Sequence, residues 1–388
     1  MAEEILLDRA DPELVNDRYD FYRRLRDETP VIRTVVNGQP SWLLTQFDDV
    51  NRAFTDRRIR VQSEVGKIPA YLGTGAASVL YSHSLPFMDD EKHARVRRLA
   101  SPPFGPKAVA TMRHWIDEVV QAGFDRLAEH DEVDFVAEFA TRVPAEIACR
   151  LVHAPLADAD SLIAAQADVT TLISQDTLTP ELLAKADRAV EFYYEYFGDL
   201  VSTLRDKLPE DDPVGLLLAA GDDALSDAEL LTTLTGYLFA SYHTTMVAFT
   251  HAVHGLLANR EEWDLLAADP ELAGPAWDEV LRYDTPTHFQ PRFVGEDLEF
   301  SGQTVEAGSH LLLCVASANR DERRFADPDR FDIRRTKNRH LSFSAGSHYC
   351  LGAPLSRLEG DILLRRLPQR FPNLSLADET PPPRFDDL

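Results

Sequence analysis

Apolar side chains recur at helical spacing over most of this chain of 388 residues. The spacing predicts successive helices from residue 89 to about 208, preceded by an amphipathic helix over 11–28. It also predicts helical segments over 261–284, with a break before Pro275, and over 353–370. Helices are therefore expected to make up most of the fold.

Two shorter regions, about 30–60 and 293–315, carry runs of β-branched and aromatic residues and predict a smaller β portion. The first region opens with a hairpin around Asn37 and Gly38, a pair that favours the tight turn of a hairpin. The expected fold class is therefore α+β, mainly α. We expect a single domain that spans residues 1–388.

Two stretches after the hairpin have less regular patterns. A short helix is expected over 50–56, capped by Asp48 or Asp49. Residues 60–88 follow neither period and are expected to be irregular. A loop of that length within a compact domain is usually functional or mobile.

One long stretch, residues 230–259, contains no Asp, Glu, Lys or Arg. It is long enough to cross a bilayer. However, it includes six threonines and three histidines, which fit a helix buried through the middle of a large soluble protein better. Ser226 and Glu229 form a capping box that opens this helix.

Charge and cysteine usage narrow the setting of the protein. A formal net charge of −25 argues against nucleic acid or an anionic membrane as a partner, because phosphates would be repelled. The three cysteines are odd in number and form no CxxC pair, which fits a reducing cytosol. Cys149 and Cys314 lie in apolar runs and are expected in the core. The acidic N-terminus has no apolar region typical of a signal peptide, so a cytoplasmic protein is expected.

The third cysteine, Cys350, lies in a loop of a different kind. Phe343 opens the loop, and Gly346 and Gly352 flank the cysteine. Glycine allows close backbone approach, and amide groups turned toward sulfur stabilise a thiolate. A buried thiolate needs a positive partner, which is usually a metal. Taken alone, the loop is equally compatible with Cys350 as a small buried hydrophobe.

Other charged and polar groups stand at suggestive spacings. Glu279 and Arg282 are expected one turn apart on a helix. They form either an ordinary surface ion pair or part of a network with Arg330. A further four side chains suit the binding of carboxylates, although each taken singly is compatible with a solvated surface group: His93, Arg97, Arg292 and His348.

The uncharged helix contains the sequence Ala-Ser-Tyr-His-Thr-Thr at residues 240–245. A hydroxyl in mid-helix bonds the carbonyl four residues earlier or offers a proton to a molecule bound beside the helix. The sequence leaves both roles open for Thr244.

Together and in this order, these features resemble the cytochrome P-450 superfamily, and in particular its soluble bacterial members, over nearly the whole chain. The resemblance rests on the F-x-x-G-x-x-x-C-x-G pattern of the loop, the E-x-x-R helix before it, an early H-x-x-x-R helix and the threonine-bearing helix between them. It implies the triangular helical prism of that family, with haem b between the long central helix and the helix after the cysteine loop.

The resemblance also implies roles for individual residues. Cys350 matches the axial thiolate ligand of the haem iron, and Phe343, Gly346 and Gly352 match the loop around it. His93, Arg97, Arg292 and His348 match the positions that hold the haem propionates. Glu279, Arg282 and Arg330 match a structural ion-pair triad. Ala240 and Thr244 match positions over the oxygen-binding face, with Thr244 active in oxygen activation.

Two features depart from the family pattern. Ser241 and His243 stand where a glycine and an acid are usual, and that acid normally helps to deliver protons. Histidine titrates near neutral pH and could replace it, or a water chain could. In addition, the chain stops at residue 388, where family members usually continue through a β-hairpin. Either that element is reduced or the sequence is short.

The implied activity is a haem-thiolate monooxygenase that inserts one atom of O2 into a small organic substrate, which is expected to be a secondary metabolite. Electrons would come from an external ferredoxin or flavodoxin and its reductase, with a docking cluster formed by Arg334, Arg335, Lys337 and Arg339. The protein is expected to be a monomer. Candidate pocket residues are Phe87, Phe239, Ala240, Thr287, His288, Phe289 and Gln290.

Two alternatives remain. With His243 in place of the acid, the protein could catalyse oxidative coupling, desaturation or a peroxide-driven reaction. It could also be an inactive haem-binding module that recruits a partner, although the presence of Cys350 and Thr244 speaks against that.

Overall fold

The computed structural model describes residues 4–7, 14, 17–36, 39–64, 66–174, 178–205, 207–209, 212–218 and 224–377. By contacts, the chain divides into two compact units: Met1–Arg60, Val120–Ala140 and Thr244–Leu388 form unit 1, and Val61–Val119 and Thr141–His243 form unit 2. Two long helices, α6 (Pro106–Leu127) and α11 (Asp227–Ala258), contribute residues to both units.

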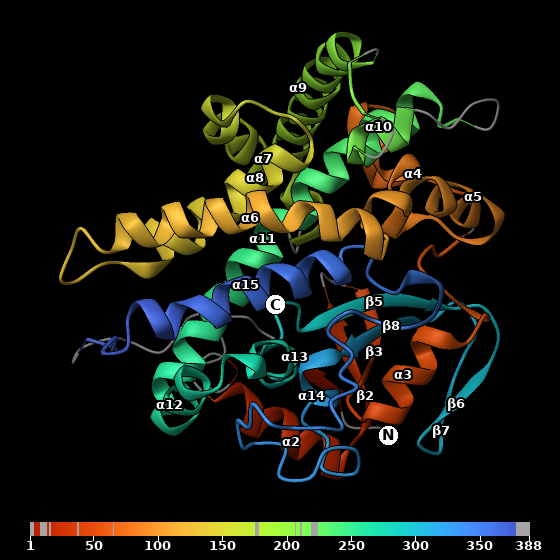
Figure 1. Ribbon diagram of the computed structural model, residues 1–388. Helices are drawn as coiled ribbons and strands as arrows, with labels where there is room; N and C mark the ends of the chain where they lie inside the picture. Colours follow the sequence, from red (N-terminus) through yellow and green to blue (C-terminus); the bar gives the residue numbers. More distant parts are fainter. Residues whose placement is uncertain are drawn as a thin grey trace. The chain divides into compact units, whose positions relative to one another are not determined.

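Unit 1 combines a mixed sheet with helices (Figure 1). Its strands are β1 (Glu4–Leu6), β2 (Val31–Val36), β3 (Gln39–Leu44), β4 (Ile59–Arg60), β5 (Phe289–Val294), β6 (Leu298–Phe300), β7 (Gln303–Val305) and β8 (His310–Cys314). Besides parts of α6 and α11, its helices are α2 (Arg18–Glu28), α3 (Phe47–Thr55), α12 (Arg260–Ala268), α13 (Ala273–Tyr283), α14 (Val315–Ala318) and α15 (Ala353–Arg370), with a π-helical turn at Val136–Ala140 and 3-10 turns at Pro270–Leu272 and Gly346–His348.

Among the described residues of unit 2, the regular elements are all helices. Besides parts of α6 and α11, its helices are α4 (Ala76–His83), α5 (Asp90–Ala100), α7 (Arg142–Leu151), α8 (Ala159–Ser174), α9 (Pro180–Leu204) and α10 (Pro213–Leu218), with 3-10 turns at Ala70–Leu72, Leu85–Phe87, Pro102–Phe104 and Leu156–Asp158.

The six-stranded sheet of unit 1 has the order β1-β2-β3-β8-β5-β4. Strand β8 is buried along its whole length, pairs in parallel with β3 and lies antiparallel to β5. Alternate residues of β8 enter different clusters, because side chains of a strand point to opposite faces. Leu311 and Leu313 join one cluster, whereas Leu312 and Cys314 join the other. The sheet therefore has two apolar faces.

Several sequence predictions are confirmed. β2 and β3 form the antiparallel hairpin, although its turn at 37–38 lies outside the described residues. In the capping box, the Ser226 hydroxyl accepts a hydrogen bond from Glu229 N, and the Glu229 carboxylate accepts one from Ser226 N. Among the described residues no helix is long and apolar enough to cross a membrane.

Other predictions are wrong in their boundaries. The helix expected over 50–56 begins at Phe47, so Asp48 and Asp49 lie in its first turn and Gln46 precedes it. The break expected before Pro275 falls at residues 269–272, and Pro275 lies in the first turn of α13, where proline is tolerated. The stretch 60–88 is not irregular, since it contains α4 and two 3-10 turns.

A buried ion-pair network holds the irregular segment of unit 1 that precedes the cysteine loop. Arg282 donates two hydrogen bonds of 2.8 Å to the Glu279 carboxylate, and both side chains are fully buried. The Arg282 guanidinium also donates to the carbonyl oxygens of Asn319 and Pro328. These bonds satisfy charges that would be costly to bury alone.

The second guanidinium of this network comes from Arg335, which corrects the expectation for Arg330. Arg335 Nε lies 3.1 Å from Glu279 Oε2, whereas the side chain of Arg330 is exposed and only its carbonyl oxygen accepts from Arg282 and Arg335. Backbone N–H of Asp332 and the amide of Asn338 also donate to Glu279. Arg335 N donates to Asp332 O at 3.1 Å, and after this turn the guanidinium of Arg335, not that of Arg330, reaches Glu279.

The two arginines provide a matched test. Replacing Arg335 with Ala should lower the free energy of unfolding by about 3 kcal/mol, because a buried carboxylate loses a charged partner. The Arg330→Ala change should alter it by less than about 0.5 kcal/mol, as is usual at the surface. Guanidinium unfolding followed by circular dichroism measures both values. Equal losses for the two variants would contradict the assignment.

Candidate functional site

Cys350 differs from the other cysteines in its exposure. Cys149 and Cys314 are buried, as expected, and burial raises the pKa of their thiols to about 11 and about 12. Cys350 is exposed on unit 1. Its side chain is therefore placed to reach a bound group, whereas the other two are core residues.

The loop around Cys350 has a defined backbone. Cys350 N donates to Phe343 O at 2.8 Å, and Phe343 itself is buried. Gly346 has a φ of +70°, and a Cβ atom there would lie 2.4 Å from Phe54 O at the end of α3. Only glycine fits both the conformation and the contact. Gly346 thus seats the loop on α3, and Gly352 precedes α15 at its N-cap position.

A chain of hydrogen bonds joins this loop to the ion-pair network. Leu341 N donates to Asn319 Oδ1 at 2.7 Å, and Asn319 Nδ2 donates to the Ser342 hydroxyl. The Ser342 hydroxyl donates to Leu281 O on α13. Because Arg282 binds the carbonyl of Asn319, the network and the loop share one residue. No sequence pattern marks Asn319, since an asparagine in an irregular segment has many possible partners.

A second group of side chains packs beside Phe343. The Arg357 guanidinium lies 4.7 Å from the centre of the Phe343 ring and donates to Asp278 and to the Tyr349 hydroxyl. Burial opposes ionisation of Asp278, but a hydrogen bond from His340 and the charge of Arg357 hold its pKa below the usual value. This group stabilises the loop from the α15 side.

The groups expected to bind carboxylates are distributed over both units. In unit 1, Arg292 is buried on β5, with its guanidinium 5.1 Å from the centre of the Phe54 ring, and His348 is half-buried in the 3-10 turn before Cys350. In unit 2, His93 and Arg97 lie one turn apart on α5. Burial, helped by the charge of Arg97, lowers the pKa of His93 to about 4, so His93 is neutral at pH 7.

This donor set fits a haem. An exposed thiol suits iron, since a thiolate is an established haem ligand. Arginine and histidine suit the carboxylates of the propionates, which accept hydrogen bonds from charged and neutral donors. Because His93 is neutral, it would contribute as a hydrogen-bond donor and not as a cation.

The middle of α11 presents one polar face. Ala240, His243 and Thr244 are exposed, and their spacing of three and four places them on the same face of the helix. Tyr242 and Thr245 are buried. The Ser241 hydroxyl donates to Tyr237 O at 2.6 Å, so this serine is satisfied within its own helix.

Glu359 is a buried acid that sequence reasoning missed. It lies on α15 and is 1% exposed. Thr245 Oγ1 donates to Glu359 Oε2 at 3.4 Å, and Oε1 has no hydrogen-bond partner within the described part of the chain. Burial raises the pKa of Glu359 to about 8. A signal was available, because Glu359 interrupts an otherwise apolar face of this helix.

The candidate pocket residues fall into two groups. In unit 2, Phe87 stacks on Tyr81 with 4.8 Å between the ring centres, and Phe239 packs edge-on against Tyr193 with 5.2 Å between the ring centres. Both phenylalanines are half-buried. The second group lies in unit 1, where His288 Nδ1 and the Tyr22 hydroxyl share a hydrogen bond of 3.1 Å.

His288 is buried, Phe289 is half-buried, and both pack against Tyr22 of α2, which argues against the pocket role expected for them. Burial lowers the pKa of His288 to about 3, so it is neutral. The half-buried Thr287 and Gln290 are left as pocket candidates from this segment.

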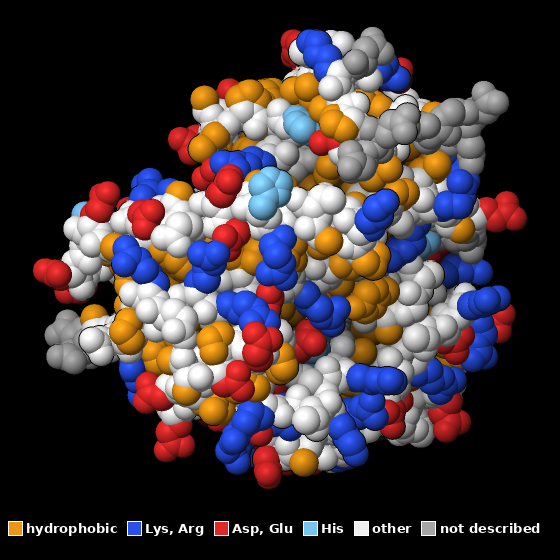
Figure 2. Space-filling view, viewed as in Figure 1, with side chains coloured by type: hydrophobic (Ala, Val, Ile, Leu, Met, Phe, Trp, Pro, Cys, Tyr) orange, Lys and Arg blue, Asp and Glu red, His pale blue; other side chains and the backbone are white. Residues whose placement is uncertain are grey.

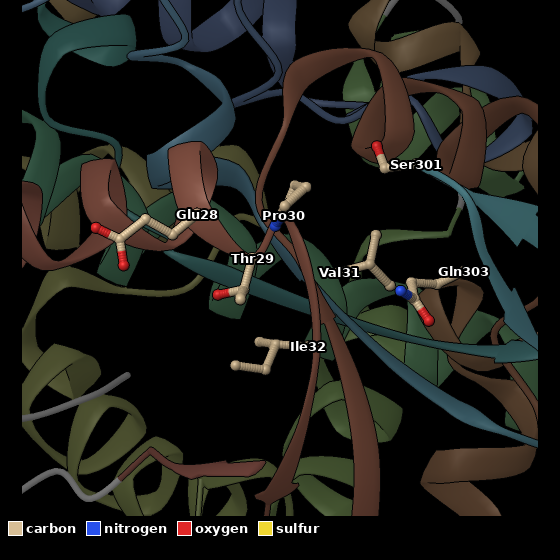
Figure 3. Close-up of a pocket in the computed structure, with 7 residues that line it drawn as sticks. All are labelled: Glu28, Thr29, Pro30, Val31, Ile32, Ser301 and Gln303. Atoms are coloured by element: carbon tan, nitrogen blue, oxygen red, sulfur yellow. The ribbon is translucent and has the colours of Figure 1, made fainter. Parts of the chain in front are cut away.

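A cavity of about 280 Å³ lies elsewhere in unit 1. Figure 3 shows its lining, which consists of the consecutive residues from Glu28 to Ile32 together with Ser301 and Gln303. None of these residues is among the candidate site residues. Its polar, open lining gives no reason to assign it to the same site.

Basic and acidic side chains are interspersed on the face drawn in Figure 2. The expected docking cluster is reduced, because Arg335 is engaged with Glu279 and is 11% exposed. Arg334, Lys337 and Arg339 are left as its possible members.

The cytochrome P450 family profile matches residues 276–388. Cytochrome P450 107B1 of Saccharopolyspora erythraea is 35% identical over 95% of this chain and 91% of its own length. Mycinamicin IV hydroxylase/epoxidase of Micromonospora griseorubida is 34% identical over 92% of this chain and 88% of its own length.

Solved structures agree. The structure of P450BioI in complex with an acyl carrier protein ligated to hexadec-9Z-enoic acid superposes with a TM-score of 0.89, at 29% identity and with 97% of each chain covered. The fold matches that of P450BioI, and the sequence is about a third identical to cytochrome P450 enzymes over nearly its whole length. This chain therefore belongs to the cytochrome P450 family and is an oxidoreductase.

Proposed function

We propose that the protein is a haem-thiolate monooxygenase that inserts one atom of O2 into a small organic substrate. The observation that carries this proposal is the exposed Cys350 in a loop that hydrogen bonds tie to the buried Glu279 network. This arrangement holds a single thiol at a defined position. A recruitment module without chemistry would not need that thiol.

Haem, when bound, supplies the redox chemistry with dioxygen, and a thiolate ligand favours cleavage of the O–O bond. Cys350 would provide the thiolate. The propionates would be held by Arg292 and His348 of unit 1 and by His93 and Arg97 of unit 2. Phe343 and Gly346 keep the loop backbone in place, and Gly352 allows α15 to begin directly after it.

On α11, Ala240 and Thr244 would face the reacting groups, and the Thr244 hydroxyl would hold a proton in that position. His243 lies on the same exposed face of the helix. Ser241 is engaged with its own helix and has a structural role.

Glu359 provides a second proton-holding group. Its carboxyl is neutral at pH 7 because burial raises its pKa, and it accepts a hydrogen bond from Thr245, the neighbour of Thr244. A neutral carboxyl both donates and accepts hydrogen bonds. With a histidine at position 243, we include Glu359 in the proposal as a buried acid that supports proton supply.

The substrate is proposed to be a secondary metabolite with apolar surface. Two relatives support this class by name: the hydroxylase/epoxidase of mycinamicin IV and, at 30% identity over 93% of this chain, the 6-deoxyerythronolide B hydroxylase of Saccharopolyspora erythraea. Phe87 and Phe239 would provide apolar contacts, and Thr287 and Gln290 polar ones. The carrier-bound fatty acid of P450BioI suggests that carrier-linked substrates should be included in any screen.

Electrons would come from a ferredoxin or flavodoxin and its reductase in the cytoplasm. Such small acidic partners require a basic surface. The stretch from residue 92 to 116 has no Asp or Glu in a chain of net charge −25, and it carries Lys92, Arg95, Arg97, Arg98, Lys107 and Arg113. The exposed members of this stretch, Lys92, Arg98, Lys107 and Arg113, are a better docking candidate than the cluster that contains Arg335.

A second candidate function keeps the haem but not the oxygen insertion. It is favoured by one observation, the exposed histidine at position 243 in place of an acid. Coupling, desaturation or a peroxide-driven reaction would then replace hydroxylation.

Isotope labelling separates these functions. A substrate is first found by screening compounds for a shift of the haem Soret band, and is then turned over with a ferredoxin, its reductase and oxygen-18 gas. Monooxygenation predicts one oxygen-18 atom in each product molecule. A coupled or desaturated product without label would contradict it and support the second function.

The Glu359→Gln variant tests the neutral state of the buried acid. The unfolded carboxyl titrates near 4.5 and the folded one near 8, so the folded protein retains a proton that the unfolded chain releases between these values. The contribution of Glu359 to stability is therefore complete below about pH 4.5 and is lost as the pH rises through 8. Glutamine cannot ionise, so it lacks this pH dependence.

We expect the unfolding free energy of the wild type, relative to Glu359→Gln, to fall by on the order of 3 kcal/mol from roughly pH 5 to roughly pH 9. Denaturant unfolding of both proteins at a series of pH values gives this difference. A difference that stays constant with pH would show that Glu359 is ionised in the folded protein.

A further inference from the structure

Arg357 lies in the second turn of α15, the helix that begins directly after the cysteine loop. Side chains of a helix lean toward its N-terminus, so a long side chain at this position reaches back over the loop. The Arg357 guanidinium donates a hydrogen bond of 3.2 Å to the hydroxyl of Tyr349. It also lies 4.7 Å from the centre of the Phe343 ring. One side chain of α15 thus contacts two aromatic residues of the loop.

Both aromatic residues are joined directly to Cys350. Tyr349 is its neighbour in the chain, and Phe343 O accepts the hydrogen bond of 2.8 Å from Cys350 N. The centres of the Phe343 and Tyr349 rings lie 6.3 Å apart. A shift of either residue would therefore move the backbone that carries the thiol.

The Arg357 guanidinium is itself fixed from α13. Its Nε donates a hydrogen bond of 2.9 Å to Asp278 Oδ1. The side chains of Arg357 and Asp278 are 42% and 29% exposed, so the ion pair alone contributes little free energy. Its effect is to fix the direction in which the guanidinium points, because the planar group presents its donors in a rigid fork.

The backbone of α15 is fixed against α13 at the same level. Trp277 Nε1 donates to the Ser356 hydroxyl at 3.3 Å. A Cβ atom at Gly360 would overlap the ring of Trp277, which is fully buried, so glycine is needed for this close approach. Trp277 therefore holds the part of α15 that carries Arg357, and Asp278, the next residue of α13, holds the Arg357 side chain.

We propose that Arg357 is a positioning residue for the Cys350 thiolate: held by α13, its guanidinium keeps the aromatic residues of the loop in place and so keeps the sulfur on the haem iron. This inference rests on the proposed function, because it concerns the axial ligand. Opening of the loop would separate sulfur from iron, and Arg357 makes this opening rarer. The network around Glu279 acts on the residues before the loop, whereas Arg357 acts on the loop itself.

The test compares Arg357→Ala and Asp278→Asn with a matched control, Arg365→Ala. Arg365 also lies on α15, where it binds Asp361 and, from another element, Glu271. No hydrogen bond or ion pair joins Arg365 to the cysteine loop within the described part of the chain. The control therefore removes an arginine and its ion pairs from the same helix without touching the loop.

Two measurements are made on the haem-loaded full chain. Hydrogen exchange at the Cys350 amide reports opening of the loop, because this amide is protected by its bond to Phe343 O. The measurement itself does not require haem. The absorption spectrum of the dithionite-reduced protein under carbon monoxide, followed over time, reports how fast the red-shifted band of thiolate ligation gives way to the band of haem that has lost this ligand.

A hydrogen bond and a contact between a cation and a ring, both partly exposed, together amount to about a tenfold change in an equilibrium. In Arg357→Ala the Cys350 amide should therefore exchange, and the red-shifted band should be lost, about tenfold faster. Asp278→Asn should raise both rates about threefold, because an amide oxygen still accepts the hydrogen bond but carries no charge. Arg365→Ala should leave both rates as in the wild type.

Equal changes in Arg357→Ala and Arg365→Ala would overturn the proposal, because the loop would then respond to a general loss of stability. Faster amide exchange with an unchanged loss of the red-shifted band would also overturn it, because Arg357 would then hold the loop without holding the ligand. If Arg357→Ala does not fold, the two rates in Asp278→Asn decide the matter. A wild-type protein that binds no haem would overturn the proposed function itself, and the amide exchange would still be measurable.

Discussion

The buried carboxylate of Glu279 is the group on which the candidate site depends. A carboxylate without water is costly, and its burial is stable only when charged partners and hydrogen bonds replace the solvent. Arg282, Arg335, Asn338 and the backbone of Asp332 provide them. These partners come from α13 and from a segment with little regular structure, so one carboxylate fixes the path of that segment.

The hydrogen bonds around Glu279 also fix the position of the cysteine loop. Arg282 fixes the carbonyl of Asn319, and the side chain of Asn319 holds Leu341 and Ser342 just before the loop. On the other side Gly346 rests on the end of α3. A thiol held in this way loses little conformational freedom when it binds a metal, and this preorganisation favours binding.

Features formed by residues close together in the sequence were predictable from it. The cysteine loop, the Glu279–Arg282 pair and the capping box of α11 are each set by residues within about ten positions of one another. Contacts between residues far apart in the sequence were not predictable. Both Arg330 and Arg335 could have reached Glu279, and only the path of the chain decides between them. α4 was missed because the carboxylate that accepts a hydrogen bond from Ala77 N at its N-terminus belongs to Asp187 of α9, far along the sequence.

Burial is the other feature that the sequence did not reveal for individual site residues. His288 carries a polar side chain in a segment expected to face the substrate, yet it lies in the core beside Tyr22. Glu359 interrupts an apolar face of α15, but an acid on a helix is usually exposed, and the packing of α15 shows that this one is buried. In both cases the residue type pointed to solvent or ligand, and the surrounding apolar side chains determined its environment.

The central claim is that the Cys350 thiolate binds haem iron. The most direct measurement is the absorption spectrum of the reduced protein under carbon monoxide, for the wild type and for Cys350→Ser after supplementation with haem. The account predicts the red-shifted Soret band of thiolate ligation in the wild type and its loss in the variant. A wild-type protein that remains colourless, or a Cys350→Ser variant that keeps the red-shifted band, would contradict it.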